Sequence, residues 1–112
     1  MQPNLDLTLM ALADPTRRAI LQRLSQGEAR VTEIAAPFSM SLNAVSKHIL
    51  TLERAQLVKR RRVGREHLLS FHAAPLDAAA RWMETQRSRW MASLDALESL
   101  LEAEDRWAWG SV

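Results

Sequence analysis

The stretch S-L-N-A-V-S-K-H-I-L-T-L-E-R-A-Q-L, residues 41–57, decides how the rest of the chain is interpreted. At 100° per residue, its apolar side chains gather on one side of a helix and its small or hydrogen-bonding side chains on the other. We expect Leu42, Val45, Ile49 and Leu52 on the buried side, and Asn43, Ala44, Lys47, Thr51 and Arg54 on the outer side. Ser41 is the expected N-cap, and the helix is expected to end near Ala55. Such an outer face fits a DNA major groove, although an ordinary amphipathic surface helix has the same pattern.

The composition of the 112 residues predicts one compact domain with a modest core, since 47% of them are hydrophobic. The absence of cysteine excludes disulfides, zinc–thiolate sites and a cysteine nucleophile. Residues 1–9 have neither a basic start nor a long apolar run, so no signal peptide is expected. No segment approaches membrane-spanning length, and we therefore expect a cytoplasmic protein without a membrane partner.

Positive charge is concentrated in one part of the chain. Residues 41–67 carry seven Lys and Arg against two Glu, a net charge of +5. Residues 1–40 are neutral overall, and residues 68–112 carry a net charge of −3. A local cationic field of this kind favours a polyanionic partner, whereas scattered charge would only aid solubility.

Two helices are predicted at the start of the chain. Apolar residues at helical spacing indicate a short first helix over 5–12. Asp14 as N-cap and Pro15 at the first helical position then start a second helix, which should stop at Gly27. In this second helix we expect Ala19, Ile20 and Leu24 to point inward, and Arg17, Arg18 and Arg23 to point largely outward.

A third, short helix is expected to begin within Val31–Ile34, with Thr32 as its cap. Pro37 should distort this helix or end it early, because the proline ring clashes with the carbonyl four residues back. Two short helices joined by a tight turn are then followed by the amphipathic helix from Ser41. This is helix-turn-helix order.

Residues 57–71 change from a helical period to a period of two. Runs 58–63 and 66–71 flank Gly64-Arg65, which predicts a hairpin with a two-residue turn. This register pairs Val58 with Phe71 and Arg60 with Leu69. Four consecutive basic residues at 59–62 are favourable beside phosphates, although cations on an edge strand also protect against aggregation. The DNA interpretation is preferred because the hairpin directly follows the candidate recognition helix.

A long helix from Pro75 to about Glu104 is predicted to follow. Its apolar residues recur in alternating steps of four and three, and the preceding domain is too small to cover them. We therefore predict a two-fold interface formed with the first helix. The expected interface residues are Leu5, Leu9, Leu12, Leu76, Met83, Trp90, Leu94, Leu97 and Leu101. A ligand pocket lined by Trp82 and Trp90 is the less favoured alternative, and the tail around residues 107–110 either docks on the dimer or frays.

Three segments together resemble a known family. A-D-P-T-R-R-A-I-L at 13–21, M-S-L-N-A-V-S-K-H-I-L-T-L-E-R-A-Q-L-V at 40–58 and R-R-R-V-G-R-E at 60–66 are similar to the ArsR-type winged-helix repressors, most of all to the cysteine-free members. The resemblance covers nearly the whole chain. It implies a mainly α fold with a small β-hairpin, a dimeric winged helix-turn-helix that forms a single domain over 1–112 with N- and C-terminal dimerisation helices.

The same resemblance implies a function. A homodimeric transcriptional repressor would bind an inverted repeat in double-stranded DNA, with the helix from Ser41 in the major groove and the hairpin as a wing toward the minor groove. By position, the family's base and phosphate contacts fall on Asn43, Ser46, Lys47 and His48, with Arg65 at the wing tip. The full expected set is Ser41, Asn43, Ala44, Ser46, Lys47, His48, Thr51, Arg60, Arg61, Arg62 and Arg65. Leu42 stands where many members carry a polar residue that can reach a base, which bears on sequence specificity.

No metal, cofactor or catalytic site is predicted. The family's metal sensors carry thiolates on the third helix, where this chain has V-T-E-I-A at 31–35, and others use histidines on the last helix, which has none. Zinc, cadmium or arsenite is therefore not expected to release the DNA. His48, His67 and His72 fall on a helix, a strand and a loop, without paired carboxylates or a Gly-rich phosphate loop nearby. We therefore expect no enzyme.

Two questions stay open at the level of sequence. An unidentified small-molecule effector would find its pocket between the first and last helices, where Trp82, Met83 and Trp90 offer apolar area and Arg87 or Arg89 an anion anchor. The alternative from another functional class is a winged-helix dimer that serves as a protein-interaction module. DNA binding with a steep dependence on salt discriminates against that alternative.

Overall fold

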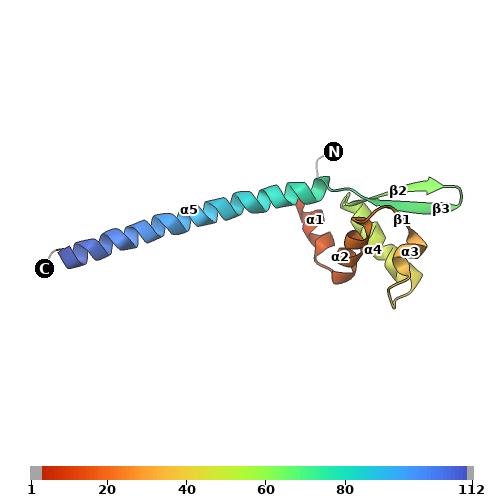
Figure 1. Cartoon of the computed structure of the whole chain (residues 1–112), viewed down its shortest axis with the longest axis horizontal. Coiled ribbons are helices and arrows are strands. Elements are labelled where there is room, and N and C mark those ends of the chain that lie inside the picture. The colour runs from red at the N-terminus through yellow and green to blue at the C-terminus, as the bar shows by residue number, and fades with distance from the viewer. Residues whose placement is uncertain (1–3, 111–112) are drawn as a thin grey trace. The chain divides into compact units, whose positions relative to one another are not determined.

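A computed structural model describes residues 4–110, and the side chains of residues 4–106. The chain divides into two compact units, Met1–Ala79 and Ala80–Val112. Its elements in order are α1 (Leu5–Leu12), α2 (Pro15–Leu24), β1 (Ala29–Arg30), α3 (Val31–Ala35), α4 (Leu42–Arg54), β2 (Val58–Val63), β3 (Glu66–Phe71) and α5 (Ala74–Gly110) (Figure 1). The predicted class, mainly helical with a small antiparallel hairpin, is confirmed.

Side-chain caps fix the starts of α1 and α2. Asn4 Oδ1 accepts a hydrogen bond from the amide of Leu7 at 3.1 Å, and Asp14 Oδ1 accepts from the amides of Thr16 and Arg17 at 2.8 and 3.1 Å. These bonds satisfy amides that have no partner within their own helix. The predicted bounds of α1 and the start of α2 are confirmed.

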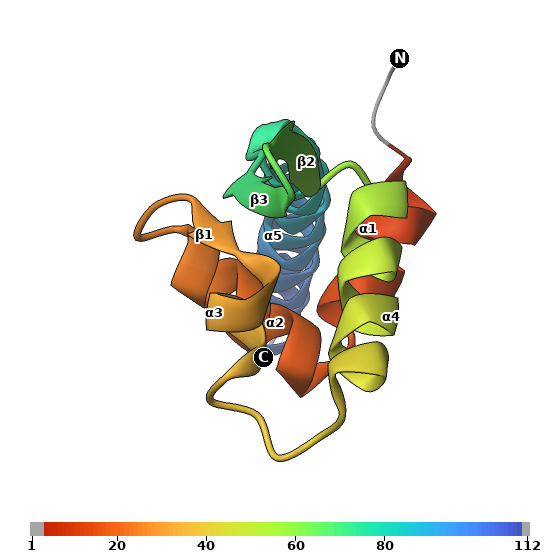
Figure 2. The ribbon, with the colours of Figure 1, turned by 90° about the vertical axis from the view of Figure 1, so that its right-hand side faces the viewer.

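Two predictions for α2 are wrong. The helix ends at Leu24, and Gly27, with φ of +140°, lies in the loop beyond it instead of stopping the helix directly. Ala19 is exposed, because Leu21 instead joins Ile20 and Leu24 on the buried side. Figure 2 shows α1 and α4 side by side, and both also contact α2.

The prediction of Thr32 as the cap of α3 is also wrong. The helix already begins at Val31, so Arg30 occupies the N-cap position, and its amide donates to Glu33 Oε1 at 3.3 Å. The helix ends at Ala35, two residues before Pro37, as the proline predicts.

The predicted ends of α4, the N-cap Ser41 and the end near Ala55, are both confirmed. Ser41 Oγ accepts from the amide of Ala44 at 3.1 Å, and Ala55 is the C-cap. Gln56 then takes a left-handed conformation with φ of +61°, its amide donates to the carbonyl of Glu53, and that of Leu57 to the carbonyl of Leu52. This end motif turns the chain directly from α4 into the wing.

The inward face of α4 is confirmed with one exception. Val45, Ile49 and Leu52 are fully buried, whereas the side chain of Leu42 is 53% exposed. Leu42 is the first residue of α4, and it lines a surface hollow in front of the wing instead of entering the core.

The wing is an antiparallel hairpin, and its predicted register is confirmed. Val58 pairs with Phe71, Arg60 with Leu69 and Val63 with Glu66, around the turn Gly64-Arg65. A third strand was not predicted: Ala29 and Arg30 of β1 pair with Leu69 and Leu68, so the sheet order is β1-β3-β2. Two residues are too short a run to show a strand period in the sequence.

One hydrophobic core joins the helices to the hairpin. Its buried side chains come from α1, α2, the β1–α3 segment, α4 and both long strands: Ala11, Ile20, Leu21, Leu24, Ala29, Ile34, Val45, Ile49, Leu52, Ala55, Leu57, Val58 and Leu69. This packing holds the wing against the end of α4. It also stabilises the hairpin, because an isolated two-stranded hairpin is only marginally stable in water.

The helix α5 is longer than predicted, since it begins one residue earlier and continues to Gly110. From Ala80 to Arg106, every described side chain except that of Gln86 is exposed. Among the described residues, no helix is both long enough and apolar enough to cross a membrane. The prediction that the tail at residues 107–110 docks on the dimer or frays depends on its side chains, and these lie outside the side chains that the structure describes, 4–106.

Candidate nucleic-acid interface

The outer face of α4 carries the residues that the sequence predicted for base contacts. Asn43 and Lys47 are exposed one turn apart, and Ala44, Ser46 and Thr51 are half-buried. Thr51 Oγ1 donates to the carbonyl of Lys47 at 3.2 Å, so its hydroxyl is already engaged within the helix. The first two turns of α4 therefore present one amide and one ammonium group to solvent, beside small side chains that leave room for a partner.

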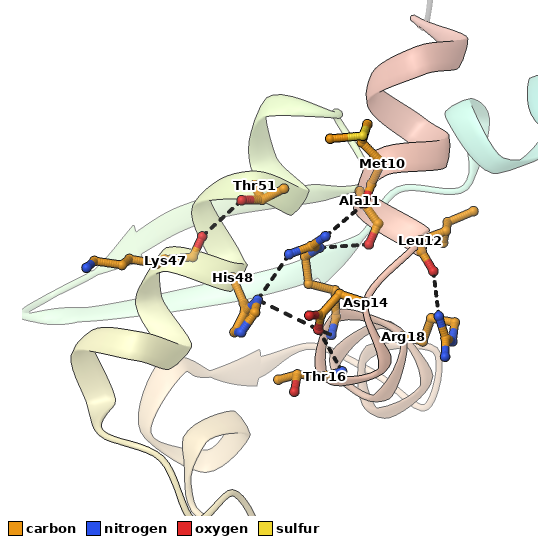
Figure 3. A network of polar contacts seen from close by, with 10 residues as sticks. Met10, Ala11, Leu12, Asp14, Thr16, Arg18, Lys47, His48 and Thr51 are labelled. Atoms are coloured by element: carbon orange, nitrogen blue, oxygen red, sulfur yellow. Dashed lines mark hydrogen bonds and ion pairs between the residues drawn. The ribbon is translucent and has the colours of Figure 1, made fainter.

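His48 lies differently from its neighbours on α4. Its Nδ1 atom is 3.2 Å from Nη1 of Arg17 and 3.8 Å from a carboxylate oxygen of Asp14, and the ring is half-buried (Figure 3). This nitrogen faces α2, so only the remaining part of the imidazole is available to a partner outside the chain.

The four basic residues of β2 divide between two faces of the hairpin. Strand residues alternate in direction, and Arg60 pairs with buried Leu69, so Arg60 and Arg62 share the face that packs toward the helices. Lys59 and Arg61 point to the opposite face. The basic run is therefore not one continuous contact surface.

Carboxylates hold two of these arginines. Arg60 donates to both oxygens of Glu53 on α4, at 3.3 and 2.6 Å. Arg61 donates to both oxygens of Glu28, at 2.8 and 2.6 Å. These hydrogen bonds hold the pKa of Glu28 below its ordinary value and raise the pKa of Arg61. Phosphate contact by Arg61 would have to break this pair.

Other cations have no such partner. Among the described residues, no carboxylate forms an ion pair with Lys47, Lys59, Arg62 or Arg65. Arg62 donates through Nε to the carbonyl of Gly64 at 3.0 Å, which directs its guanidinium along the turn. The start of α4, the start of β2 and the wing tip thus carry cations that are available to a polyanion.

A hollow of about 340 Å³ joins α4 to the wing. Ser46 and Leu42 of α4 line one side, Arg60, Arg65 and His67 line the wing side, and Arg30 stands at the edge formed by β1. Arg30 forms an ion pair with Glu66, with 2.7 Å between Nε and Oε2. The sequence did not single out Arg30, because its place beside the wing depends on the pairing of β1 with β3.

Comparisons with known proteins agree with this arrangement. A helix-turn-helix domain family matches residues 12–61. The HTH-type transcriptional regulator Rv2034 of Mycobacterium tuberculosis is 35% identical over 99 residues, which cover 88% of this chain and 90% of that protein. The crystal structure of an ArsR family transcriptional regulator, RHA00566, is 40% identical, with a TM-score of 0.74 over 78% of this chain and 96% of that one. This chain belongs to the ArsR family of transcriptional regulators.

A further solved relative bears on assembly. The homodimeric winged helix-turn-helix DNA-binding domain Mb0332 of Mycobacterium bovis, described as a possible ArsR-family regulator, is 28% identical. Its TM-score is 0.57, with coverage of 80% of each chain. The predicted resemblance to the ArsR family and the winged helix-turn-helix fold are both confirmed.

The residues expected at a dimer interface of this ArsR-family chain are either half-buried or exposed, and none of them is fully buried. Within α1, the fully buried residues are Thr8 and Ala11, and Thr8 Oγ1 donates to the carbonyl of Asn4 at 3.0 Å. The predicted stripe is left half-buried at Leu5 and Leu12 and exposed at Leu9. On the first turns of α5, Leu76 is half-buried; beyond them the exposed members are Met83, Trp90, Leu94, Leu97 and Leu101.

The sequence also led to expectations about metal ligands and about a pocket for an effector in this family member. Among the described residues, no group of three or more histidines and carboxylates lies close enough to hold a metal ion. The residues expected around an effector, Trp82, Met83, Trp90, Arg87 and Arg89, belong to the helical unit, where all five side chains are exposed.

Proposed function

We propose that this ArsR-family chain is a homodimeric repressor that binds an inverted-repeat operator, with α4 in the major groove and the β2–β3 wing on the adjacent backbone and minor groove. The observation that carries the proposal is the exposure of Asn43 and Lys47 on α4, on the helix that also borders the cationic hollow of the wing. A helix with small side chains between its two exposed donors can approach base edges closely.

The two halves of this surface have different roles. Asn43 can pair bidentately with adenine, and Lys47 can donate to guanine; a good bidentate contact is worth about 1–3 kcal/mol against a wrong base. Arg62 and Arg65 on the wing supply charge to the phosphates, which is independent of sequence. Specificity therefore comes from α4 and a large part of the affinity from the wing.

Dimerisation is proposed because α5 leaves a long apolar stripe exposed. The side chain of Trp90 is 66% exposed, and Leu94, Leu97 and Leu101 continue the stripe. Contiguous exposed apolar surface of this kind on a soluble chain marks an interaction surface. The preferred partner is a second copy, since the stripe then meets the same stripe across a two-fold axis.

Charge along α5 supports an antiparallel pairing of two copies. Residues 81–90 carry three Arg against one Glu, whereas residues 95–106 carry five acids against one Arg. A two-fold axis across the helix places the basic half of one copy beside the acidic half of the other. Light scattering at micromolar concentration should give twice the monomer mass of 12.7 kDa, and a stable monomer would contradict this architecture.

We expect the bound dimer to repress transcription because it occupies its operator. A dimer that covers two half-sites about one helical turn, about 34–36 Å, apart excludes other proteins from the same stretch of DNA. Transcription in vitro from a promoter that contains the selected site should fall as the protein is added, and a rise would identify an activator.

The proposal is tested by DNA affinity with charge-matched variants. Lys47→Ala should weaken binding to the preferred duplex more than binding to random duplex, whereas Arg23→Ala in the last turn of α2, which removes the same charge, should change both little. Fluorescence anisotropy of labelled duplexes measures both affinities. Equal losses of DNA affinity in the two variants would show that α4 is not part of the DNA interface. No DNA binding by the wild-type protein would favour the protein-interaction module.

A further inference from the structure

One side chain joins three helices beside the middle of α4. The guanidinium of Arg17, on α2, donates through Nε to the carbonyl of Ala11 and through Nη2 to the carbonyl of Met10, both at 2.8 Å. Its Nη1 lies 3.2 Å from Nδ1 of His48 on α4 (Figure 3). A single planar group thus bonds the end of α1 and the middle of α4.

The chemistry of this contact makes it directional. The guanidinium carries only donors, so His48 Nδ1 must accept, and the imidazole proton is then on Nε2. The last carbonyls of α1 have no amide partner further along the helix, and a cation is favourable at this negative end of the helix dipole. The planar fork of arginine can serve both helices at once, which a lysine ammonium at the end of a flexible stem cannot do with the same geometry.

Arg18, the next residue, provides an internal comparison. Its Nη1 donates to the carbonyl of Leu12 at 2.8 Å, so it also binds the end of α1. It is exposed, and no hydrogen bond or ion pair joins it to α4 among the described residues. The two neighbouring arginines therefore share the contact to α1, and Arg17 alone of the two connects it to α4.

We propose that Arg17 is a positioning residue: through Met10, Ala11 and His48 it fixes the recognition helix α4 against the dimerisation helix α1, and so sets the half-site spacing that the dimer accepts. The inference rests on the proposed function, in which α4 binds the DNA of a homodimer, and on the part in the dimer interface that the sequence predicts for α1. In a dimer, any rotation of α4 relative to α1 is applied twice, once in each protomer. A spacing mismatch then costs affinity even when each half-site contact is intact.

The test compares Arg17→Lys with Arg18→Lys, since neither changes the charge and both are on the same turn of α2. Duplexes carry the selected inverted repeat at its own spacing, at a spacing one base pair longer, or as a single half-site. Arg17→Lys should reduce the preference for the original spacing by about tenfold, within the usual range of coupling energies, with half-site affinity changed less than about twofold. Arg18→Lys should leave the preference unchanged, and equal effects of the two variants would overturn the proposal.

A second measurement needs no DNA. Amide hydrogen exchange in Arg17→Lys should rise both in the last turn of α1 and around His48 in α4, whereas Arg18→Lys should affect α1 alone. Exchange confined to α1 in both variants would overturn the link between the helices. A wild-type protein that binds no inverted repeat would instead overturn the proposed function, together with the role of Arg17 in spacing, while the exchange pattern would still decide the link.

Discussion

The two arginines Arg61 and Arg65 on one wing should behave differently when each is replaced by alanine. Both changes remove one positive charge. Arg61 is bonded to Glu28 through two hydrogen bonds and points away from the helices, whereas Arg65 is at the turn and lines the hollow in front of α4. We therefore predict that Arg65→Ala weakens DNA binding strongly and Arg61→Ala weakly.

The size of the effect follows from counterion release. Each phosphate contact contributes about 0.9 to the slope of log affinity against log salt. A dimer loses two contacts when Arg65 is replaced, so the slope should fall by about 1.8. At a salt concentration of about 0.1 M each contact is worth about eightfold in affinity, or about 1.2 kcal/mol, which gives about 2.4 kcal/mol for the dimer.

The assay is fluorescence anisotropy of a labelled random duplex, titrated with each variant over a range of potassium chloride concentrations. A random duplex isolates the phosphate contribution, because base contacts contribute little to it. For Arg61→Ala the slope should change by less than about half a unit. Equal decreases of the slope for the two variants would refute the division of the wing into a paired and an available arginine.

Four further predictions concern stability and regulation. Ser41→Ala removes the cap on the amide of Ala44 and should lower the free energy of unfolding by about 1 kcal/mol in urea titrations; no change would mean that the cap contributes nothing. Ile49→Ala should lower it by about 2–5 kcal/mol, because Ile49 is fully buried in the core. The hydrogen bond from the Arg17 amide is the main cause that holds the pKa of Asp14 below its ordinary value, so this cap stabilises the fold above that ordinary pKa and loses its effect as the pH falls through the lowered pKa. Asp14→Asn should therefore flatten the acid limb of the unfolding curve, and an unchanged limb would contradict the assignment. Stoichiometric zinc, cadmium or arsenite should leave DNA affinity unchanged in a chain without cysteine, and a tight one-to-one metal complex that abolishes binding would refute this.

Local signals explain why much of the fold could be predicted from the sequence. Asp14-Pro15 and Ser41 set helix starts through caps that act within three residues, and Gly64-Arg65 set the hairpin register through the turn. This register pairs Val58 with Phe71 and Arg60 with Leu69, as the structure has them. Each of these features depends on neighbours in the chain and not on the rest of the fold.

The remaining features depend on contacts between distant segments. The pairs Arg61–Glu28 and Arg17–His48 join residues 33 and 31 positions apart, and no local pattern indicates either. The exposure of Leu42 arises because the start of α4 faces the hollow beside the wing, although helical periodicity alone groups Leu42 with the core residues. Charge in the sequence predicts which wing residues can contact phosphates. Whether an arginine is available for such a contact depends on its carboxylate partner, which the sequence does not indicate.

Binding of an inverted repeat by two copies of α4 can be tested by selecting bound duplexes from random DNA with the purified wild-type protein. We expect enrichment of a two-fold symmetric sequence whose half-sites are centred about 10 base pairs apart or a multiple of that distance. Lys47→Ala should lose this enrichment, whereas Arg23→Ala on α2 should retain it. A pool that stays random after repeated rounds, or a single asymmetric site bound by one chain, would refute recognition of an inverted repeat by two copies of α4.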